Sequence, residues 1–377
     1  MKKQKLFSPG PVMVEDNVRK ALLHPDICHR SSEFEELFQK LQKKICTLFG
    51  ADDSYYSLVI SGSGTAANET VLSSLFASSH DKVLLISNGV FGERLEEIIQ
   101  KYQIPMLKID TPWATPPDLK DVEQVLRENP DIKVIAMVFH ETSTGMINPV
   151  HEVGELSQKY GKIFFVDSVS AAAGQNIDVA ENHIDITTSV GGKCLGAFPG
   201  SAYICAKESI LQSLSPDQCK NVYLNLYKHY SAAKENTCFV LFFFFCMPTH
   251  HSLTPNTPNV TLFWALDAAL DNILNEGVEN RVQRYAKNAE ILRNGLKELG
   301  LELLIQEHLS NTVTSVFLPK HLDLHKFLSQ MEMDGYTLYP GKGKYLEMGM
   351  FQVANMGAIS EEDCYEFLDC LKKNLLS

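Results

Sequence analysis

Short apolar segments alternate with amphipathic segments in the N-terminal half of the chain, and this alternation constrains the fold more than any other feature. Apolar segments of strand length occur at residues 56–61, 83–87, 105–109, 133–139, 163–166 and 184–189. Segments with helical spacing of apolar side chains occur at residues 33–49, 66–76, 95–102, 119–128 and 153–160. Because alternating strands and helices form mostly parallel sheets covered on both faces, we predict an α/β fold.

Polar side chains follow the predicted strands at the points where they end. Residues 62–65 read Gly-Ser-Gly-Thr and join a predicted strand to a predicted helix. This turn lacks the lysine of a phosphate-binding P-loop and the third glycine of a dinucleotide fingerprint. It is therefore more typical of a site for a single phosphate group at a helix start. An ordinary loop turn is the open alternative.

Lys193 and Asp167 are charged residues in unusual settings. Lys193 stands among glycines and small residues just after the segment 184–189. A partly dehydrated lysine has a lowered pKa and can form a Schiff base with an aldehyde, although a lysine in a surface loop is the alternative. Asp167 follows four apolar residues, and a buried carboxylate requires a cation or a strong donor beside it. Its alternative role is to cap the next turn.

The charge and the cysteines limit the classes of partner and compartment. A formal net charge of −12 argues against a nucleic-acid binder, which usually carries a basic face. The nine cysteines form no Cys-x-x-Cys pair, and residues 1–6 lack the apolar core of a signal peptide. We expect a cytoplasmic protein with reduced thiols, without a metal or membrane association, whose partner is a small molecule or another chain.

The length of 377 residues predicts two domains. We place a large domain with an N-terminal arm at residues 1–270 and a smaller α+β domain at residues 271–377. The large domain contains an apolar insertion at residues 238–253, which begins with a run of ten apolar residues. The run is shorter than the roughly 18 to 20 residues of a transmembrane helix. A buried strand, an oligomer contact and an aberrant insertion remain open.

Taken in order, these segments resemble the class V aminotransferases of the pyridoxal-phosphate fold type I superfamily, most closely the 2-aminoethylphosphonate:pyruvate transaminases. The resemblance covers nearly the whole chain and rests on residues 8–11, 61–66, 88–94, 141–149, 166–174, 189–200 and 257–270. It implies a large domain with a mostly parallel sheet, a smaller C-terminal domain and pyridoxal 5′-phosphate as cofactor. It also implies a homodimer with a shared active site.

The resemblance also implies roles for individual residues. Lys193 would bind the cofactor covalently and move the proton, and Asp167 would pair with the pyridine nitrogen. The other expected cofactor-binding residues are Ser63, Gly64, Thr65, Phe91, Thr142, Val169 and Thr257. Ser63, Gly64 and Thr65 would hold the phosphate, and Phe91 would stack on the ring. Thr142 would approach the ring hydroxyl, and Val169 would contact the opposite ring face. Thr257 would reach the phosphate of the neighbouring subunit.

Three residues are expected on the substrate side, namely Pro9, Gly10 and Gln352. Gln352 stands where close relatives carry an arginine that binds the substrate carboxylate, and glutamine lacks both the charge and the bidentate geometry. The resemblance predicts amino transfer from 2-aminoethylphosphonate, or a similar small anionic amine, to pyruvate, giving phosphonoacetaldehyde and L-alanine. A lyase or decarboxylase with the same cofactor, and an inactive paralogue that acts as a binding protein, are the alternatives.

Overall fold

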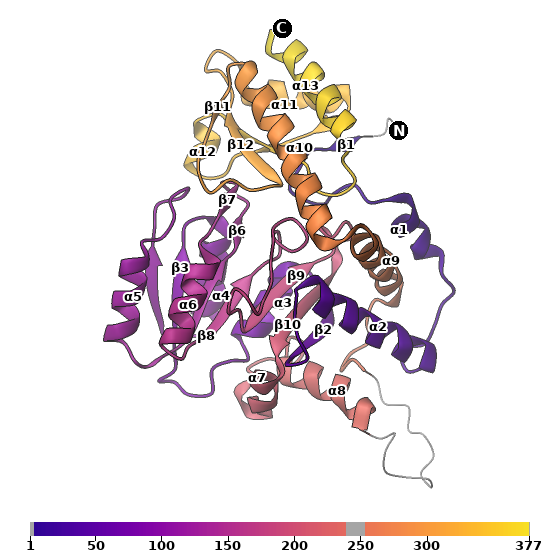
Figure 1. Cartoon of the computed structure of the whole chain (residues 1–377), viewed down its shortest axis with the longest axis vertical. Helices are drawn as coiled ribbons and strands as arrows, with labels where there is room; N and C mark the ends of the chain where they lie inside the picture. The colour runs from indigo at the N-terminus through magenta and orange to yellow at the C-terminus, as the bar shows by residue number, and fades with distance from the viewer. Residues whose placement is uncertain (1–3, 239–252, 377) are drawn as a thin grey trace.

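A seven-stranded sheet forms the centre of the computed structural model, which describes residues 4–238 and 253–376 (Figure 1). The strand order is β2-β10-β9-β8-β5-β3-β4, and only β10 runs antiparallel to the other strands of this sheet. The strands are β2 (Tyr55–Gly62), β3 (Lys82–Ser87), β4 (Met106–Asp110), β5 (Ile132–Val138), β8 (Ile163–Asp167), β9 (Ile186–Val190) and β10 (Gly200–Lys207). The predicted mostly parallel α/β sheet is confirmed.

Helices cover both faces of this sheet. The inner strands β3, β5, β8 and β9 are buried along almost their whole length, and a strand is buried in this way only when both faces of its sheet are covered. The helices of this part are α1 (Asp16–Lys20), α2 (Ser32–Leu48), α3 (Gly64–Leu72), α4 (Val90–Lys101), α5 (Leu119–Glu128), α6 (Val150–Lys159), α7 (Glu208–Ser213), α8 (Leu226–Cys238) and α9 (Val260–Glu276). A small hairpin of β6 (His140–Glu141) and β7 (Met146–Ile147) follows β5.

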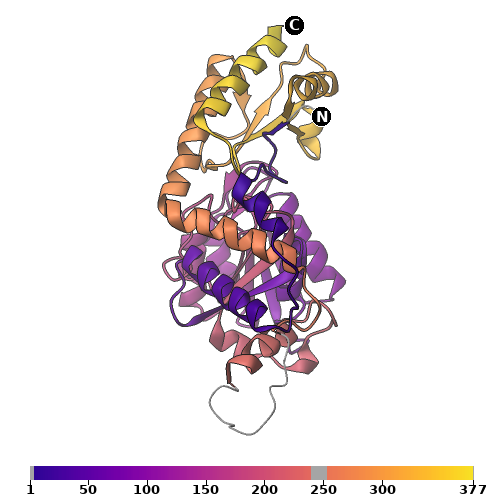
Figure 2. The same cartoon turned by 90° about the vertical axis from the view of Figure 1, so that its right-hand side faces the viewer.

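A second, antiparallel sheet in the order β11-β12-β15-β14 lies at the C-terminal end of the chain. Its strands are β11 (Glu302–Leu303), β12 (Val313–Phe317), β14 (Tyr339–Pro340) and β15 (Met350–Ala354). The helices beside it are α10 (Val278–Glu298), α11 (Leu324–Asp334), α12 (Lys344–Glu347) and α13 (Glu361–Leu376). We call this sheet with its helices the second unit, and the seven-stranded sheet with its helices the first unit. Figure 2 shows the second unit above the first one, with the long α10 running between them.

The N-terminal arm and α10 connect the two units. In the arm, β1 (Lys5–Leu6) pairs in parallel with β13 (Tyr336–Thr337), and the Phe7 ring stacks on Phe367 with centroids 4.4 Å apart. Along α10, Tyr285 belongs to the core of the first unit and Leu292 to that of the second. The predicted domain division after residue 270 falls within α9 and stays a prediction.

Several local predictions differ from the structure. The sequence analysis did not anticipate β10 or β15, it placed the start of α4 near residue 95, and it extended α3 to residue 76. Most of the predicted insertion, residues 239–252, lies outside the described residues. None of the helices in the described parts is long and apolar enough to cross a membrane. No three potential metal ligands gather in those parts either.

His229 of α8 makes the stability dependent on pH. Burial lowers the pKa of this side chain from 6.5 to about 4, and its Nε2 donates to the Tyr223 carbonyl oxygen at 3.1 Å. Because the folded state resists protonation, stability present above pH 6.5 is lost as the pH falls towards 4. Between pH 6.5 and 4, the free energy of unfolding measured in urea should fall by about 3 kcal/mol more for the wild type than for His229→Gln. An equal fall in both proteins would contradict the lowered pKa of His229.

Candidate active site

The carboxyl ends of β2, β8 and β9 open into a single cavity of about 280 Å³. The residues that line it are Gly10, Pro11, Ser63, Gly64, Thr65, Asn68, Phe91, Arg94, Asp167, Val169, Val190, Gly192, Lys193, Pro199 and Gly200. Most of the site residues expected from the sequence are among them. The strand ends of the sheet thus bring together residues that are far apart in the chain.

Lys193 reaches this cavity beside the N-terminal arm. Its Nζ donates a hydrogen bond to the Pro9 carbonyl oxygen, and burial lowers its pKa. Gly10 has a φ of +120°, and a Cβ there would lie 2.8 Å from the Gly192 carbonyl oxygen, so only glycine permits this approach. A lowered pKa increases the fraction of free amine, which is the nucleophilic form of lysine.

Asp167 is the last residue of β8 and is only 4% exposed. Its Oδ1 accepts the backbone N–H of Val169 at 2.9 Å, and its Oδ2 accepts Nδ2 of Asn68 at 2.6 Å. The Thr188 hydroxyl donates to Asn68 Oδ1 at 2.6 Å and thereby orients the amide. Burial raises the pKa of Asp167, and no cation among the described residues forms an ion pair with it. The carboxylate therefore lines the cavity without a direct ion pair to any described cation.

The first turn of α3 forms a polar rim of the same cavity. Ser63 caps the helix, because its Oγ accepts the N–H of Ala66 at 3.3 Å. A Cβ at Gly64 would lie 2.6 Å from Val169 Cγ2, so a larger residue would disturb the packing there. The helix dipole and the unpaired N–H groups of a first turn favour an anion at this position.

Phe91 lines the cavity from the first turn of α4, which begins at Val90 and not near residue 95 as predicted. Glu141 explains this early start. Its buried carboxylate accepts the backbone N–H groups of Phe91 at 3.1 Å and of Gly92 at 3.2 Å. Burial raises the pKa of Glu141 to about 7. This carboxylate satisfies the free donors of the helix start and fixes Phe91 in place.

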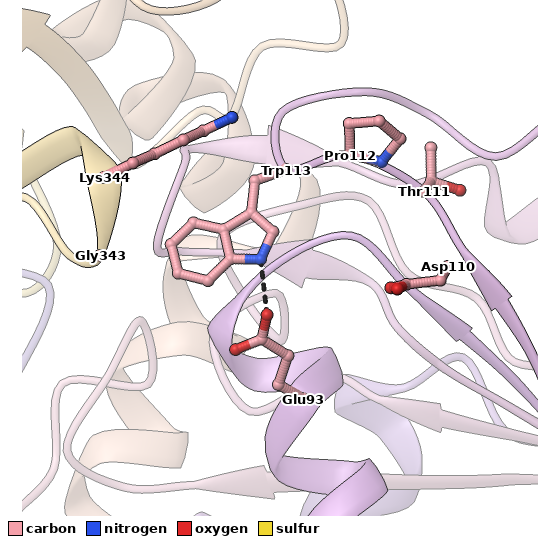
Figure 3. A pocket seen from close by; sticks show the side chains of 7 residues that line it. All are labelled: Glu93, Asp110, Thr111, Pro112, Trp113, Gly343 and Lys344. Carbon is pink, nitrogen blue, oxygen red and sulfur yellow. Dashed lines mark hydrogen bonds between the residues drawn. The ribbon is translucent and has the colours of Figure 1, made fainter.

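A second cavity of about 470 Å³ lies beside α4, between the two units (Figure 3). The Trp113 indole N–H donates to Glu93 Oε1 at 2.8 Å, and the same ring faces Gly343 of the second unit. The hydroxyl of Tyr345 donates to the Trp113 carbonyl oxygen at 3.1 Å. Trp113 therefore contacts the segment around residue 343 of the second unit and joins the two units there.

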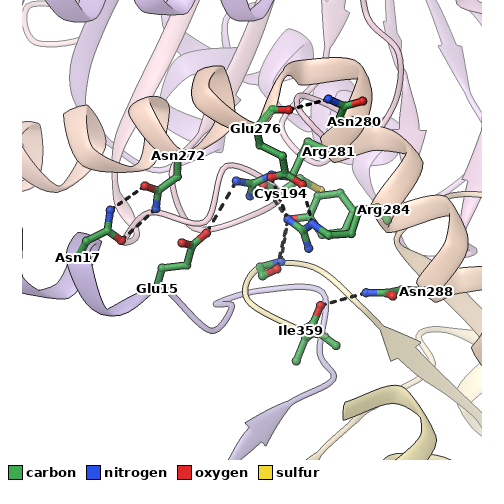
Figure 4. Close-up of polar contacts among 12 residues, drawn as sticks. Glu15, Asn17, Cys194, Asn272, Glu276, Asn280, Arg281, Arg284, Asn288 and Ile359 are labelled. Atoms are coloured by element: carbon green, nitrogen blue, oxygen red, sulfur yellow. Dashed lines mark hydrogen bonds and ion pairs between the residues drawn. The ribbon is translucent and has the colours of Figure 1, made fainter. Parts of the chain in front are cut away.

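Helix α10 supports the backbone next to Lys193. The hydroxyl of Tyr285 donates to the Cys194 carbonyl oxygen at 3.0 Å. Near the start of the helix, Arg281 pairs with Glu276, and Arg284 Nε donates to the same carboxylate at 2.7 Å. Figure 4 shows Cys194 beside this network. The loop that carries Lys193 is thus braced by a helix shared between the two cores.

Four of the expected site residues are not in the lining of the cavity. Pro9 contributes only its carbonyl oxygen to Lys193, and Thr257 is exposed in the loop before α9. Thr142 is buried, and its carbonyl oxygen accepts Nε2 of Gln352 at 2.6 Å. Gln352 also donates to Ser315 Oγ at 3.1 Å and is 2% exposed.

Three residues near the site were missed by the sequence analysis. Asn68 lies one helical turn after Gly64, so helical periodicity was an available signal for its position on the cavity side. Arg94 lies one turn after Phe91 in the same way, and its Nη1 donates to Thr65 Oγ1 at 3.4 Å. His140 is the first residue of β6, and burial lowers its pKa to about 4. Its Nε2 is buried without a hydrogen-bond partner in the described structure.

The sequence profile of the family described as Aminotransferase class-V matches residues 17–337. The chain belongs to the class V aminotransferases. Its cofactor is pyridoxal phosphate, as membership of this family implies. The cavity described above is the place in this aminotransferase where a lysine, a buried carboxylate and a polar rim meet.

Full-length relatives of this aminotransferase include proteins with and without a known activity. An uncharacterised aminotransferase of Methanocaldococcus jannaschii is 34% identical over 374 residues, covering 98% of this chain and 92% of that protein. A 2-aminoethylphosphonate–pyruvate transaminase of Lysinibacillus sphaericus is 30% identical, covering 100% of this chain and 98% of that protein. The solved ureidoglycine–glyoxylate aminotransferase of Bacillus subtilis superposes with a TM-score of 0.89 at 26% identity, covering 100% of this chain and 94% of that one.

The residues of the cavity fit this cofactor. Asp167 is a buried carboxylate without a cation, and a protonated pyridine nitrogen would supply that cation. The rim at Ser63 and Gly64 offers helix N–H groups to a phosphate. Lys193 offers an amine with a lowered pKa to the aldehyde. The pyridine nitrogen, the phosphate and the aldehyde of the cofactor thus each have a complementary group in the cavity.

Proposed function

We propose that this aminotransferase transfers the amino group of 2-aminoethylphosphonate to pyruvate, giving phosphonoacetaldehyde and L-alanine. The observation that carries the proposal is that Lys193 and Asp167 line the same cavity as the first turn of α3. The substrate pair is taken from relatives that bear this activity in their names at 30% identity over nearly the whole chain. In the reaction, the amine carbon of the donor is oxidised to an aldehyde while the keto carbon of pyruvate is reduced.

In this proposal Lys193 binds the cofactor covalently, and Asp167 keeps its ring nitrogen protonated. When bound, the cofactor supplies an electron-withdrawing ring that stabilises negative charge on the amine carbon. Lys193 Nζ would hold and move the proton of that carbon as a general base and acid. Ser63, Gly64 and Thr65 hold the phosphate.

Phe91 covers one face of the ring in this proposal, Val169 covers the other, and Thr142 lies near the ring hydroxyl. These roles agree with the cavity lining for Phe91 and Val169. The side chain of Thr142 is buried outside that lining, and its carbonyl oxygen already binds Gln352. The proposed contact of Thr142 therefore needs its hydroxyl rather than its backbone.

We further propose that the enzyme is a cytoplasmic homodimer in which Thr257 reaches the phosphate of the neighbouring subunit. The exposed position of Thr257 supports this assignment, since it leaves the side chain accessible to a second chain. The proposed division into residues 1–270 and 271–377 is supported by the two separate sheets. Sedimentation of the purified enzyme tests the dimer, and a monomer with full activity would contradict the shared site.

The substrate proposal is tested with the purified enzyme, 2-aminoethylphosphonate and pyruvate, with L-alanine as the measured product. We expect alanine and phosphonoacetaldehyde to form in equal amounts, because one amino group moves per turnover. Alanine as donor with phosphonoacetaldehyde should run the reaction backwards. Consumption of the donor without any keto acid would favour the lyase or decarboxylase. A bound cofactor with no reaction of any amine would favour the inactive paralogue.

A further inference from the structure

Gln352 leaves open how the enzyme recognises an anionic substrate. Both observed hydrogen bonds of its Nε2 are made inside the protein, to the Thr142 carbonyl oxygen at 2.6 Å and to Ser315 Oγ at 3.1 Å. The side chain is 2% exposed and carries no charge. An anionic group on the substrate would need a cation elsewhere at the edge of the cavity.

Lys342 is such a cation. Its Nζ lies 5.0 Å from the ring centroid of Phe91, which lines the cavity. The residue is exposed, and within the described residues its amine has neither a hydrogen bond nor an ion pair with a carboxylate. The nearby aromatic face attracts an ammonium group but does not neutralise it, so the charge stays available to a ligand.

The backbone around Lys342 contacts both units. The N–H of Gly341 donates to the Met350 carbonyl oxygen at 2.7 Å. Gly343 has a φ of +51°, and a Cβ there would lie 3.1 Å from Cη2 of Trp113. Figure 3 shows this close approach of Gly343 to the indole. With both neighbours fixed, the position of the ammonium group depends mainly on its own side chain.

Arg94 is the other cation near Phe91, with its Cζ 6.0 Å from the ring centroid. Arg94 also contacts Thr65 Oγ1 at 3.4 Å, on the rim that we assign to the cofactor phosphate. The two cations therefore serve different anions in the same cavity. Arg94 belongs to the phosphate rim, whereas Lys342 lies on the second unit and approaches the ring of Phe91 from there.

We propose that Lys342 is a specificity-determining residue that selects amino donors with a terminal anionic group by pairing with that phosphonate or carboxylate. This inference rests on the proposed function, because it names the part of the substrate that the site recognises. It assigns recognition of the anionic group to Lys342, on the loop after β14, because Gln352 carries no charge. Removing the charge of Lys342 is therefore expected to lower the affinity for the anion and to leave the chemistry at Lys193 intact.

The binding test titrates methylphosphonate, and separately acetate, into the cofactor-loaded enzyme by calorimetry. Charged hydrogen bonds contribute about 1.5–3 kcal/mol, so Lys342→Met should raise the Kd for methylphosphonate by about 10-fold to 100-fold. Lys342→Arg should restore most of the affinity. Lys344→Met is the matched control, since Lys344 begins α12 two residues later and its Nζ lies 5.1 Å from the ring centroid of Tyr345 instead. Acetate distinguishes a general anion site from one selective for phosphonate.

The kinetic test compares 2-aminoethylphosphonate with propylamine, an amine of similar size that lacks an anionic group. Lys342→Met should raise the KM of the anionic donor by a similar factor with kcat nearly unchanged, and should leave propylamine unaffected. Equal behaviour of Lys342→Met and Lys344→Met, or no methylphosphonate binding by the wild type, would overturn the inference. Binding that depends on Lys342 without turnover of 2-aminoethylphosphonate would instead refute the proposed donor and leave the anion site standing.

Discussion

Replacing Lys193 with alanine is expected to lower kcat by at least about a thousandfold and to remove the visible absorbance of the bound cofactor. The side chain is the only amine in the lining of the described cavity. Its lowered pKa favours the free amine that attacks an aldehyde, and no neighbouring residue in that lining can replace it as a proton carrier at the same position. Absorbance spectra after incubation with pyridoxal phosphate and steady-state rates measure the two effects.

Lys193→Arg separates the amine from the charge. A guanidinium keeps the positive charge near Asp167 but is protonated at all ordinary pH values, so it cannot act as a nucleophile or base. We expect it to be as inactive as the alanine variant. Lys207→Ala is the matched control, because this lysine pairs with Asp185 at the far end of β10 and lies outside the cavity. An active Lys193→Ala protein would refute the assigned role.

Replacing Asp167 with asparagine is expected to lower kcat by about a hundredfold or more. The size of the side chain is kept, but the charge that holds the cofactor nitrogen protonated is lost. The hydrogen bonds can be largely kept, because Asn68 can rotate its amide and use the Thr188 hydroxyl as its new partner. The defect should therefore appear in catalysis rather than in folding.

The spectrum of the bound cofactor and the unfolding curve distinguish these outcomes. Asp185→Asn is the control, since Asp185 is a second carboxylate close to the sheet that pairs with Lys207 at 2.8 Å and accepts the N–H of Phe164 at 2.8 Å. It should lower stability without changing kcat. If Asp167→Asn keeps full activity, or if both variants lose activity equally, the proposed pairing with the pyridine nitrogen is wrong.

The sheet was predictable from sequence because its strands are short, apolar and separated by amphipathic helices. One strand of this sheet, β10, escaped prediction. The strand β10 follows Lys193 and the Gly-rich loop directly, without a helix between β9 and β10, and therefore breaks the alternating pattern. The start of α4 was also missed, because the carboxylate that caps it comes from Glu141, which is distant in the chain. Local periodicity does not contain such long-range contacts.

The site was predictable where it depends on strand ends and was not predictable where it depends on packing between the units. The alignment of parallel strands brings Lys193, Asp167 and the Gly-Ser-Gly-Thr turn together. The internal hydrogen bonds of Gln352 and the position of Lys342 over Phe91 arise only when the second unit docks on the first. Neither sequence periodicity nor a sequence motif predicts how the second unit packs on the first.

The N-terminal arm has a mechanical consequence for this enzyme. Its first strand is anchored to β13 in the second unit, while a few residues later the Pro9 carbonyl oxygen accepts a hydrogen bond from Lys193. The intervening chain is short and contains Phe7, which is clamped against Phe367. A rotation of the second unit would therefore shift the Pro9 carbonyl oxygen and the hydrogen bond that it accepts from Lys193. Mutations far from the cavity, at the seam between β1 and β13, would change how readily Lys193 is released for reaction.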